Sequence, residues 1–163
     1  IYGMSAFGLG KALGIPRNMA QEYIDSYFSK YPGVKLYMEQ TKEIAREKGY
    51  VETLFGRRLY LPGIHSGRTR QAAERAAINA PMQGTAADIM KIAMINIQDW
   101  LEKEKIKAKM ILQVHDEVIL EVATKEADSV ATKISEIMSK AAKLSVPLEV
   151  ESGIADNLSL IHI

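Results

Sequence analysis

The sequence predicts an α+β fold, in which an antiparallel sheet is packed by helices. Segments with helical periodicity and short β-branched runs follow one another in the order helices, hairpin, long helix, hairpin, helix, strand. The 163 residues, 47% of them hydrophobic and 25% charged, have an ordinary globular composition. No repeat, linker or low-complexity run divides the chain, so one domain or a large piece of one is expected.

The N-terminal part of the chain is expected to be helical. Residues 1–14 combine four glycines with apolar side chains, a pattern typical of the tail of a helix, a loop and a short helical turn. Pro16 suits the first position of the next helix, with Asn18 as its cap, and this helix should stop before Pro32. A further helix should end at Gly49.

The middle of the chain predicts a small hairpin and a long helix. Residues 50–55 and 58–61 flank Gly56 and favour a hairpin. Residues 69–104 carry a helical pattern rich in Ala, Ile and Met. Pro81 must kink or break that helix, because it lacks the N–H that a continuing helix needs.

The last third predicts a second hairpin, a helix and a strand. The β-branched runs 110–114 and 118–122 flank the polar triplet at positions 115–117, so the triplet should lie at the tip of a tight hairpin. An amphipathic helix is expected over residues 126–144, and a strand with alternating side chains over residues 148–152.

The triplet His115-Asp116-Glu117 is a candidate metal site. Carboxylate oxygens at the end of a rigid β-ribbon suit Mg²⁺, which keeps positions open for water and phosphate oxygens. A solvated turn explains the same residues, since Asp favours turns and Glu tolerates them. The triplet alone leaves both interpretations open.

A polar stripe on the long helix is a candidate nucleic-acid contact. Arg75, Asn79 and Gln83 recur every fourth residue and so line one helix face over about 12 Å, among small alanines. Such a stripe suits base edges and phosphates in a groove, although a hydrated face has the same pattern. Nearby, Arg57, Arg58, Arg68, Arg70 and Arg75 cluster in one stretch, which fits phosphate contact or a solvated basic face.

Several classes of site and location are excluded by composition. The chain has no cysteine, so it has no disulfide partner, thiolate metal site or cysteine nucleophile. It has no run apolar enough for a membrane span and no signal-peptide pattern, so no membrane association is expected. The chain opens in mid-pattern at Ile1, which suggests a fragment.

Four segments, taken together, resemble the C-terminal part of a family A DNA polymerase, of the DNA polymerase I type. They are Tyr2-Gly3 with MSAFGL, TLFGRRLYLP at 53–62, ERAAINAPMQGTAAD at 74–88 and QVHDEV at 113–118. The resemblance implies a fragment of the DNA/RNA polymerase fold. Its antiparallel palm-type sheet would hold a central β-hairpin, with a helical remnant of the fingers. Residues 1–157 would be the end of the fingers and part of the palm, and residues 158–163 an atypical tail.

The resemblance also implies an activity: template-directed DNA synthesis from dNTPs by a two-metal mechanism, in replication or repair. Asp116 would be the catalytic carboxylate for two Mg²⁺ ions, with Glu117 as a weaker contributor. His115 would lie near the primer terminus, and Tyr2 by the nucleotide pocket.

Further roles implied by the resemblance concern DNA. Arg75, Asn79 and Gln83 would contact the primer–template, and Arg57 and Arg58 would either position DNA or brace the fingers. The location would be cytoplasmic, in a bacterial or phage-infected cell, and nucleoid-associated.

Two divalent ions need more carboxylates than Asp116 and Glu117. The family's other palm aspartate and its triphosphate-binding Arg and Lys have no counterpart in the sequence, so the chain alone is expected to be inactive. Three other interpretations remain: a non-catalytic module that binds duplex DNA, a single-subunit RNA polymerase and a plain structural domain.

Overall fold

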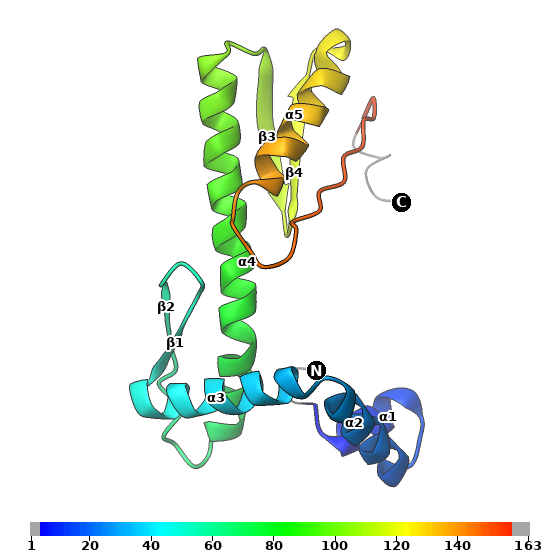
Figure 1. Ribbon diagram of the computed structural model, residues 1–163, viewed down its shortest axis with the longest axis vertical. Helices are drawn as coiled ribbons and strands as arrows, with labels where there is room; N and C mark the ends of the chain where they lie inside the picture. The colour runs from blue at the N-terminus through cyan, green and yellow to red at the C-terminus, as the bar shows by residue number, and fades with distance from the viewer. Residues whose placement is uncertain (1–3, 158–163) are drawn as a thin grey trace. The chain divides into compact units, whose positions relative to one another are not determined.

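The computed structural model describes residues 4–157, which form five α-helices, one 3₁₀ turn and two antiparallel β-ribbons (Figure 1). The chain divides into two compact units, Ile1–Thr85 and Ala86–Ile163, which we call unit 1 and unit 2. Helix α4, Arg70–Lys103, begins in the first and ends in the second. The predicted α+β class is confirmed.

The first described element of unit 1 is a short helix, which includes the short helical turn expected for this stretch; residues 1–3 lie outside the described residues. Helix α1 spans Ala6–Leu13, and the hydroxyl of Ser5 caps it by accepting a hydrogen bond of 3.2 Å from the Gly8 amide. Gly14 ends the helix in the left-handed conformation, with φ of 65°. Two good caps, one on either side of these eight residues, explain why this glycine-rich stretch is helical.

The next two helices end where the sequence predicts. Helix α2, Arg17–Lys30, stops before Pro32, but Asn18 lies inside it and does not cap it; Pro16 precedes its first residue. Helix α3, Pro32–Lys48, has its proline at the first position and ends at Gly49, which has φ of 74°. The expected cap at Asn18 was wrong because Pro16 places the helix start two residues earlier.

The first β-ribbon joins α3 to α4. Strands β1, Tyr50–Glu52, and β2, Arg58–Tyr60, pair antiparallel. In Figure 1, α3 runs across the first part of α4 and the ribbon stands beside it. The core between them consists of Ala45, Val51, Leu61, Ile64 and Ala77.

Helix α4 continues through Pro81 without a break. A proline inside a helix costs about 3 kcal/mol, because it removes a hydrogen bond and crowds the preceding turn. Two features of unit 1 offset that cost: Ala77 and Ile78 are almost fully buried, and the Tyr37 hydroxyl donates a 3.1 Å hydrogen bond to the Ile78 carbonyl. The break that the sequence allowed therefore does not occur.

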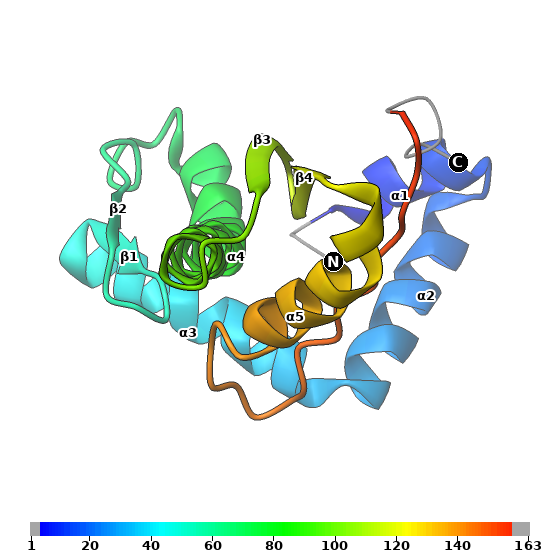
Figure 2. The same ribbon diagram turned by 90° about the horizontal axis from the view of Figure 1, so that it is seen from above.

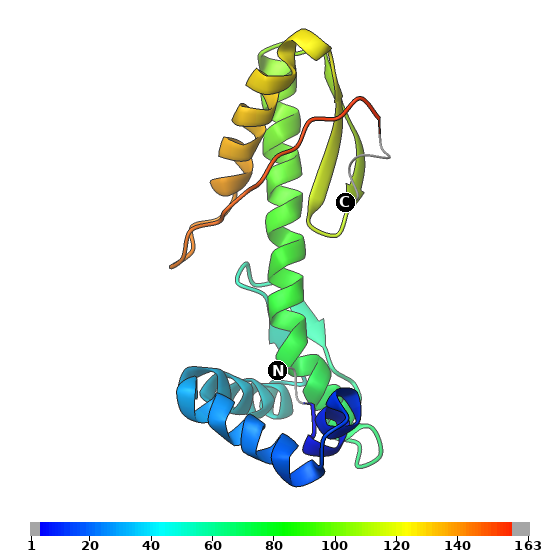
Figure 3. The same ribbon diagram turned by 90° about the vertical axis from the view of Figure 1, so that its right-hand side faces the viewer.

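Unit 2 is built on the second β-ribbon. Strands β3, Ala108–Val114, and β4, Glu117–Val122, pair antiparallel and are followed by the 3₁₀ turn η1, Thr124–Glu126, and by helix α5, Ala127–Ser139. Figures 2 and 3 show the ribbon and α5 each lying beside the C-terminal half of α4. The buried residues at their junction are Ile97, Leu101, Val130 and Ile134.

The register of this ribbon changes at one residue. Met110 pairs with Leu120 but Leu112 pairs with Ile119, so Ile111 is an extra residue of the bulge type. The change moves Leu112 to the face opposite Met110, and Leu112 is 45% exposed.

The C-terminal segment differs from the prediction. Helix α5 ends at Ser139 rather than near 144, and residues 148–152 form no strand. Their alternating pattern defines two faces, but a strand also needs a hydrogen-bonded neighbour, and the described residues offer it none. Among residues 4–157, no helix combines the length and apolarity needed to cross a membrane.

Candidate active site and nucleic-acid contacts

The triplet His115-Asp116-Glu117 occupies the two-residue turn of the β3–β4 ribbon and the first position of β4. Val114 pairs with Glu117, so His115 and Asp116 form the turn. His115 has φ of 52°, a conformation that favours glycine and is uncommon for other residues. The Gln113 side chain donates a 2.7 Å hydrogen bond to the His115 carbonyl and so holds the turn.

All three side chains of the triplet are exposed. Asp116 and Glu117 therefore offer carboxylate oxygens to solvent, and these are the donors that Mg²⁺ takes. Within residues 4–157, no three His, Asp or Glu side chains are grouped closely enough to hold a metal ion. The turn fits a part of a metal's coordination shell, and other ligands must complete it.

The predicted stripe on α4 lies in unit 1. Arg75 and Gln83 are exposed, whereas Asn79 is half-buried. The Oδ1 atom of Asn79 is buried and has no hydrogen-bond partner in the described chain. A buried amide oxygen without a partner costs about 1–3 kcal/mol, so Asn79 adds a local cost to this turn of α4.

Each predicted site feature lies in one of the two units or outside the described residues. The stripe belongs to unit 1 and the acidic turn to unit 2. Tyr2 and the predicted tail, 158–163, lie outside the described residues.

Glu74, the first residue of the motif at 74–88, holds two helices together. Its Oε1 atom accepts hydrogen bonds from Arg46 of α3, at 2.7 and 3.1 Å, and from Arg70 of α4, at 2.9 Å. These two guanidinium groups, Arg46 first, lower the pKa of Glu74. The spacing of Arg70 and Glu74 signals their contact in the sequence, but nothing in the sequence signals Arg46.

Arg57 joins the β1–β2 ribbon to α4. Its Nη2 atom donates a 2.9 Å hydrogen bond to the Gly84 carbonyl, and its own amide donates to the buried Thr53 hydroxyl at 3.1 Å. Beside it, the Leu54 amide donates to the Thr85 hydroxyl at 2.9 Å. These contacts hold the β1–β2 ribbon against α4.

Arg58 has different contacts from its neighbour. It bonds Glu52 across the ribbon at 3.1 Å, and its guanidinium lies 4.7 Å from the centre of the Tyr50 ring. Hydrogen bonds with Glu52 and Tyr60 raise the pKa of Arg58. These contacts remain within the ribbon, so Arg58 stabilises β1 against β2.

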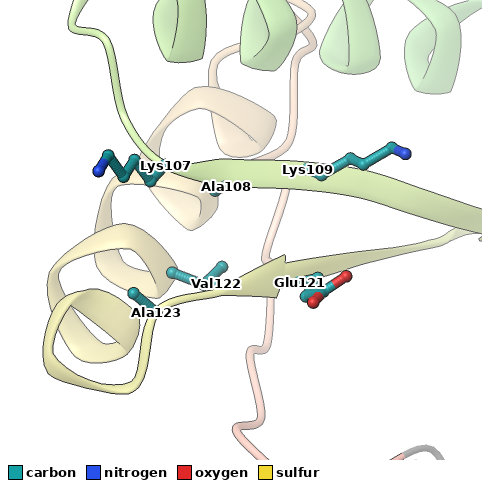
Figure 4. A pocket seen from close by; sticks show the side chains of 6 residues that line it. All are labelled: Lys107, Ala108, Lys109, Glu121, Val122 and Ala123. Carbon is teal, nitrogen blue, oxygen red and sulfur yellow. The ribbon is translucent and has the colours of Figure 1, made fainter.

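A shallow hollow of about 390 Å³ lies at the open end of the second ribbon, where Ala108 pairs with Val122 (Figure 4). Lys107, Lys109 and Glu121 line it together with Val122 and Ala123. The ribbon separates it from the acidic turn by roughly 20 Å, the length of seven extended residues. The hollow is therefore not part of the predicted site.

Comparisons with known proteins give one consistent result. The family model described as DNA polymerase family A matches residues 1–159. DNA polymerase I of Pseudomonas aeruginosa is 58% identical over 164 residues, which cover 99% of this chain and 18% of the relative. The thermostable DNA polymerase I of Thermus aquaticus is 48% identical over 159 residues, covering 96% of this chain and 19% of the relative.

A solved structure has the same fold. It is the POL domain of Pol1 from M. smegmatis in complex with DNA primer-template and dNTP; the TM-score is 0.88 and the identity 43%, over 91% of this chain and 26% of that one. The chain spans less than a fifth of the length of the two curated relatives.

Proposed function

Because the chain belongs to DNA polymerase family A, we propose that it forms part of the active site and of the DNA-binding surface of a DNA-directed DNA polymerase. The observation that carries the proposal is the exposed acidic pair Asp116-Glu117, held at the tip of a rigid ribbon. A positive φ is usual in a two-residue hairpin turn, so it is the placement of the two exposed carboxylates at the tip that supports the proposal.

The two carboxylates would hold divalent metal, Mg²⁺ in our proposal. Asp116 would be the main ligand and Glu117 the weaker one. When bound, two such ions lower the pKa of the primer hydroxyl and stabilise the leaving pyrophosphate. The ribbon's part is to fix the direction of the Asp116 carboxylate, and His115 would lie beside the primer terminus. Because the described residues supply only part of the ligand set, the 163-residue chain alone would not incorporate nucleotides.

The α4 stripe would bind the primer–template. Arg75 would contact phosphate, and Asn79 and Gln83 would contact the groove. Tyr2 would shape the dNTP pocket. Residues 1–157 would then belong to the fingers and palm of a bacterial or phage enzyme that works at the nucleoid in replication or repair.

The test is primer extension by a chimera in which this chain replaces the matching segment of the Pseudomonas aeruginosa enzyme. Asp116→Ala should lower extension at least about a hundredfold, the scale of losing one electrostatic contact to a developing charge. Glu121→Ala is the matched control, because Glu121 is an exposed carboxylate on the same strand and the same face as Glu117. Equal activity of the two variants would refute a metal role for Asp116.

A second candidate, a DNA-binding module without catalysis, is favoured by the exposed Arg75 and Gln83 of the stripe. Under this alternative, the chimera would bind primer–template with a steep salt dependence and never extend it. Asp116→Ala would then change neither binding nor extension.

A further inference from the structure

We propose that Arg57 is a positioning residue, whose guanidinium fixes the turn of α4 that presents Gln83 to DNA. The inference rests on the proposed function, because it takes Gln83 as a DNA contact. All the residues involved lie in unit 1.

The turn of α4 around Gln83 is weak as a helix. Pro81 supplies no N–H, so this turn lacks one of the hydrogen bonds that hold a regular helix. Gly84 has a helix propensity about 1 kcal/mol worse than alanine, and Thr85 is β-branched. Three unfavourable residues in five leave the path of this turn poorly determined by its own backbone.

Three hydrogen bonds with residues outside α4 hold this turn. Tyr37 of α3 donates to the Ile78 carbonyl at 3.1 Å, before the proline. After the proline, Arg57 donates to the Gly84 carbonyl at 2.9 Å, and the Thr85 hydroxyl accepts from the ribbon at 2.9 Å. The Arg57 bond is charge-assisted and therefore the strongest of the three in kind.

The backbone of Arg57, whose guanidinium is the donor, is itself held by a hydrogen bond. The Arg57 amide is bonded to the hydroxyl of Thr53, which is 5% exposed, so the backbone that carries the guanidinium is anchored in the core of unit 1. The helix also approaches so closely that a Cβ on Gly84 would lie 3.2 Å from the Arg57 Nη2 atom. The guanidinium therefore lies directly against the Gly84 peptide and bonds its carbonyl, and Gln83 is the residue directly before it.

Arg57 is itself exposed, so a direct contact with a DNA phosphate is the rival explanation. The two explanations differ in salt dependence. A lost phosphate contact lowers the slope of log K against log salt by about 0.9. A lost positioning bond weakens the Gln83 contact and leaves the slope unchanged.

The experiment is a double-mutant cycle on primer–template binding by the chimera, measured at several salt concentrations. Arg57→Ala should weaken binding about tenfold, as expected for a charged hydrogen bond, but less than about twofold when Gln83→Ala is already present. Arg58→Ala is the matched comparison: it removes the same charge one residue away, and its effect should be additive with Gln83→Ala.

A second variant at position 57 controls for misfolding of Arg57→Ala. Arg57→Met keeps the aliphatic stem and removes the donors, so it should give the same coupling to Gln83 as Arg57→Ala. Additive effects of Arg57 and Gln83 in both variants, or a reduced salt slope, would overturn the positioning role and leave the polymerase proposal intact. Coupling in a chimera that binds DNA but never extends primers would support the positioning role while refuting the proposed synthesis.

Discussion

Replacing Gly84 with alanine tests how tightly the first ribbon is docked on α4. An added Cβ would lie 2.7 Å from the Thr53 Cγ2 atom, 3.2 Å from the Arg57 Nη2 atom and 3.3 Å from the Leu59 Cδ1 atom. The first distance is too short for any real contact, so either the helix or the ribbon must move. Thr53 is 5% exposed and β-branched, so it cannot rotate away freely.

Two opposing terms set the magnitude. Alanine is the better helix former by about 1 kcal/mol. Overpacking a buried contact costs typically 1–3 kcal/mol, and here it also displaces the Arg57 bond to the Gly84 carbonyl, which contributes about 1.5 kcal/mol or more. The free energy of local unfolding around Gly84 should therefore fall by about 2 kcal/mol.

The assay is native-state hydrogen exchange of the α4 and ribbon amides in the chimera, which reports local unfolding free energies. Gly33→Ala is the control, because Gly33 lies in α3 with open space around its Cβ position and should gain up to about 1 kcal/mol. Thr53→Ser should rescue Gly84→Ala, since it removes the clashing methyl and keeps the hydroxyl that Arg57 needs. Slower exchange in Gly84→Ala alone would refute the close approach.

Two further predictions concern pH. Arg46 and Arg70 lower the pKa of Glu74, so this carboxylate stabilises unit 1 above its unfolded pKa of about 4.5, and the stabilisation is lost as the pH falls below that value. Glu74→Gln should lower the protection of the α3 amides against hydrogen exchange by about 1–3 kcal/mol at pH 7 and should flatten its dependence on acid pH. An unchanged acid profile in this variant would contradict the prediction. Hydrogen bonds from Lys133 and Lys140 lower the pKa of Glu136 to about 2. The protection of the α5 amides against hydrogen exchange should therefore decline between about pH 4.5 and pH 2, and should decline less in high salt. The same decline in Glu136→Gln would show that another group titrates.

Local backbone chemistry accounts for what the sequence predicted well. Gly49 ends α3 because glycine accepts the left-handed conformation, and Pro32 starts it because its ring fixes a helical φ. The β-branched runs on either side of the triplet needed only a two-residue turn to pair, so the position of Asp116 at the tip followed from the sequence. These features depend on residues a few positions apart.

Long-range contacts account for the rest. The sequence marks Pro81 as a helix breaker, but the Tyr37 bond to the Ile78 carbonyl and the packing of Ala77 in the core of unit 1 keep α4 continuous, and most of these partners lie far away in the chain. Residues 148–152 alternate as a strand does, but an alternating pattern determines only faces; whether a strand forms depends on a neighbouring backbone.

In the predicted site, too, some features depend on local sequence and others on long-range contacts. The sequence by itself determined the family, the fold class and the identity of the acidic pair and the α4 stripe, because motifs and periodicity are local. Only the tertiary structure decided that Arg57 braces α4 at Gly84 and that Glu74 joins two helices. The physical reason is that a hydrogen bond is fixed by where two backbones meet, and that meeting depends on the packing of the whole unit.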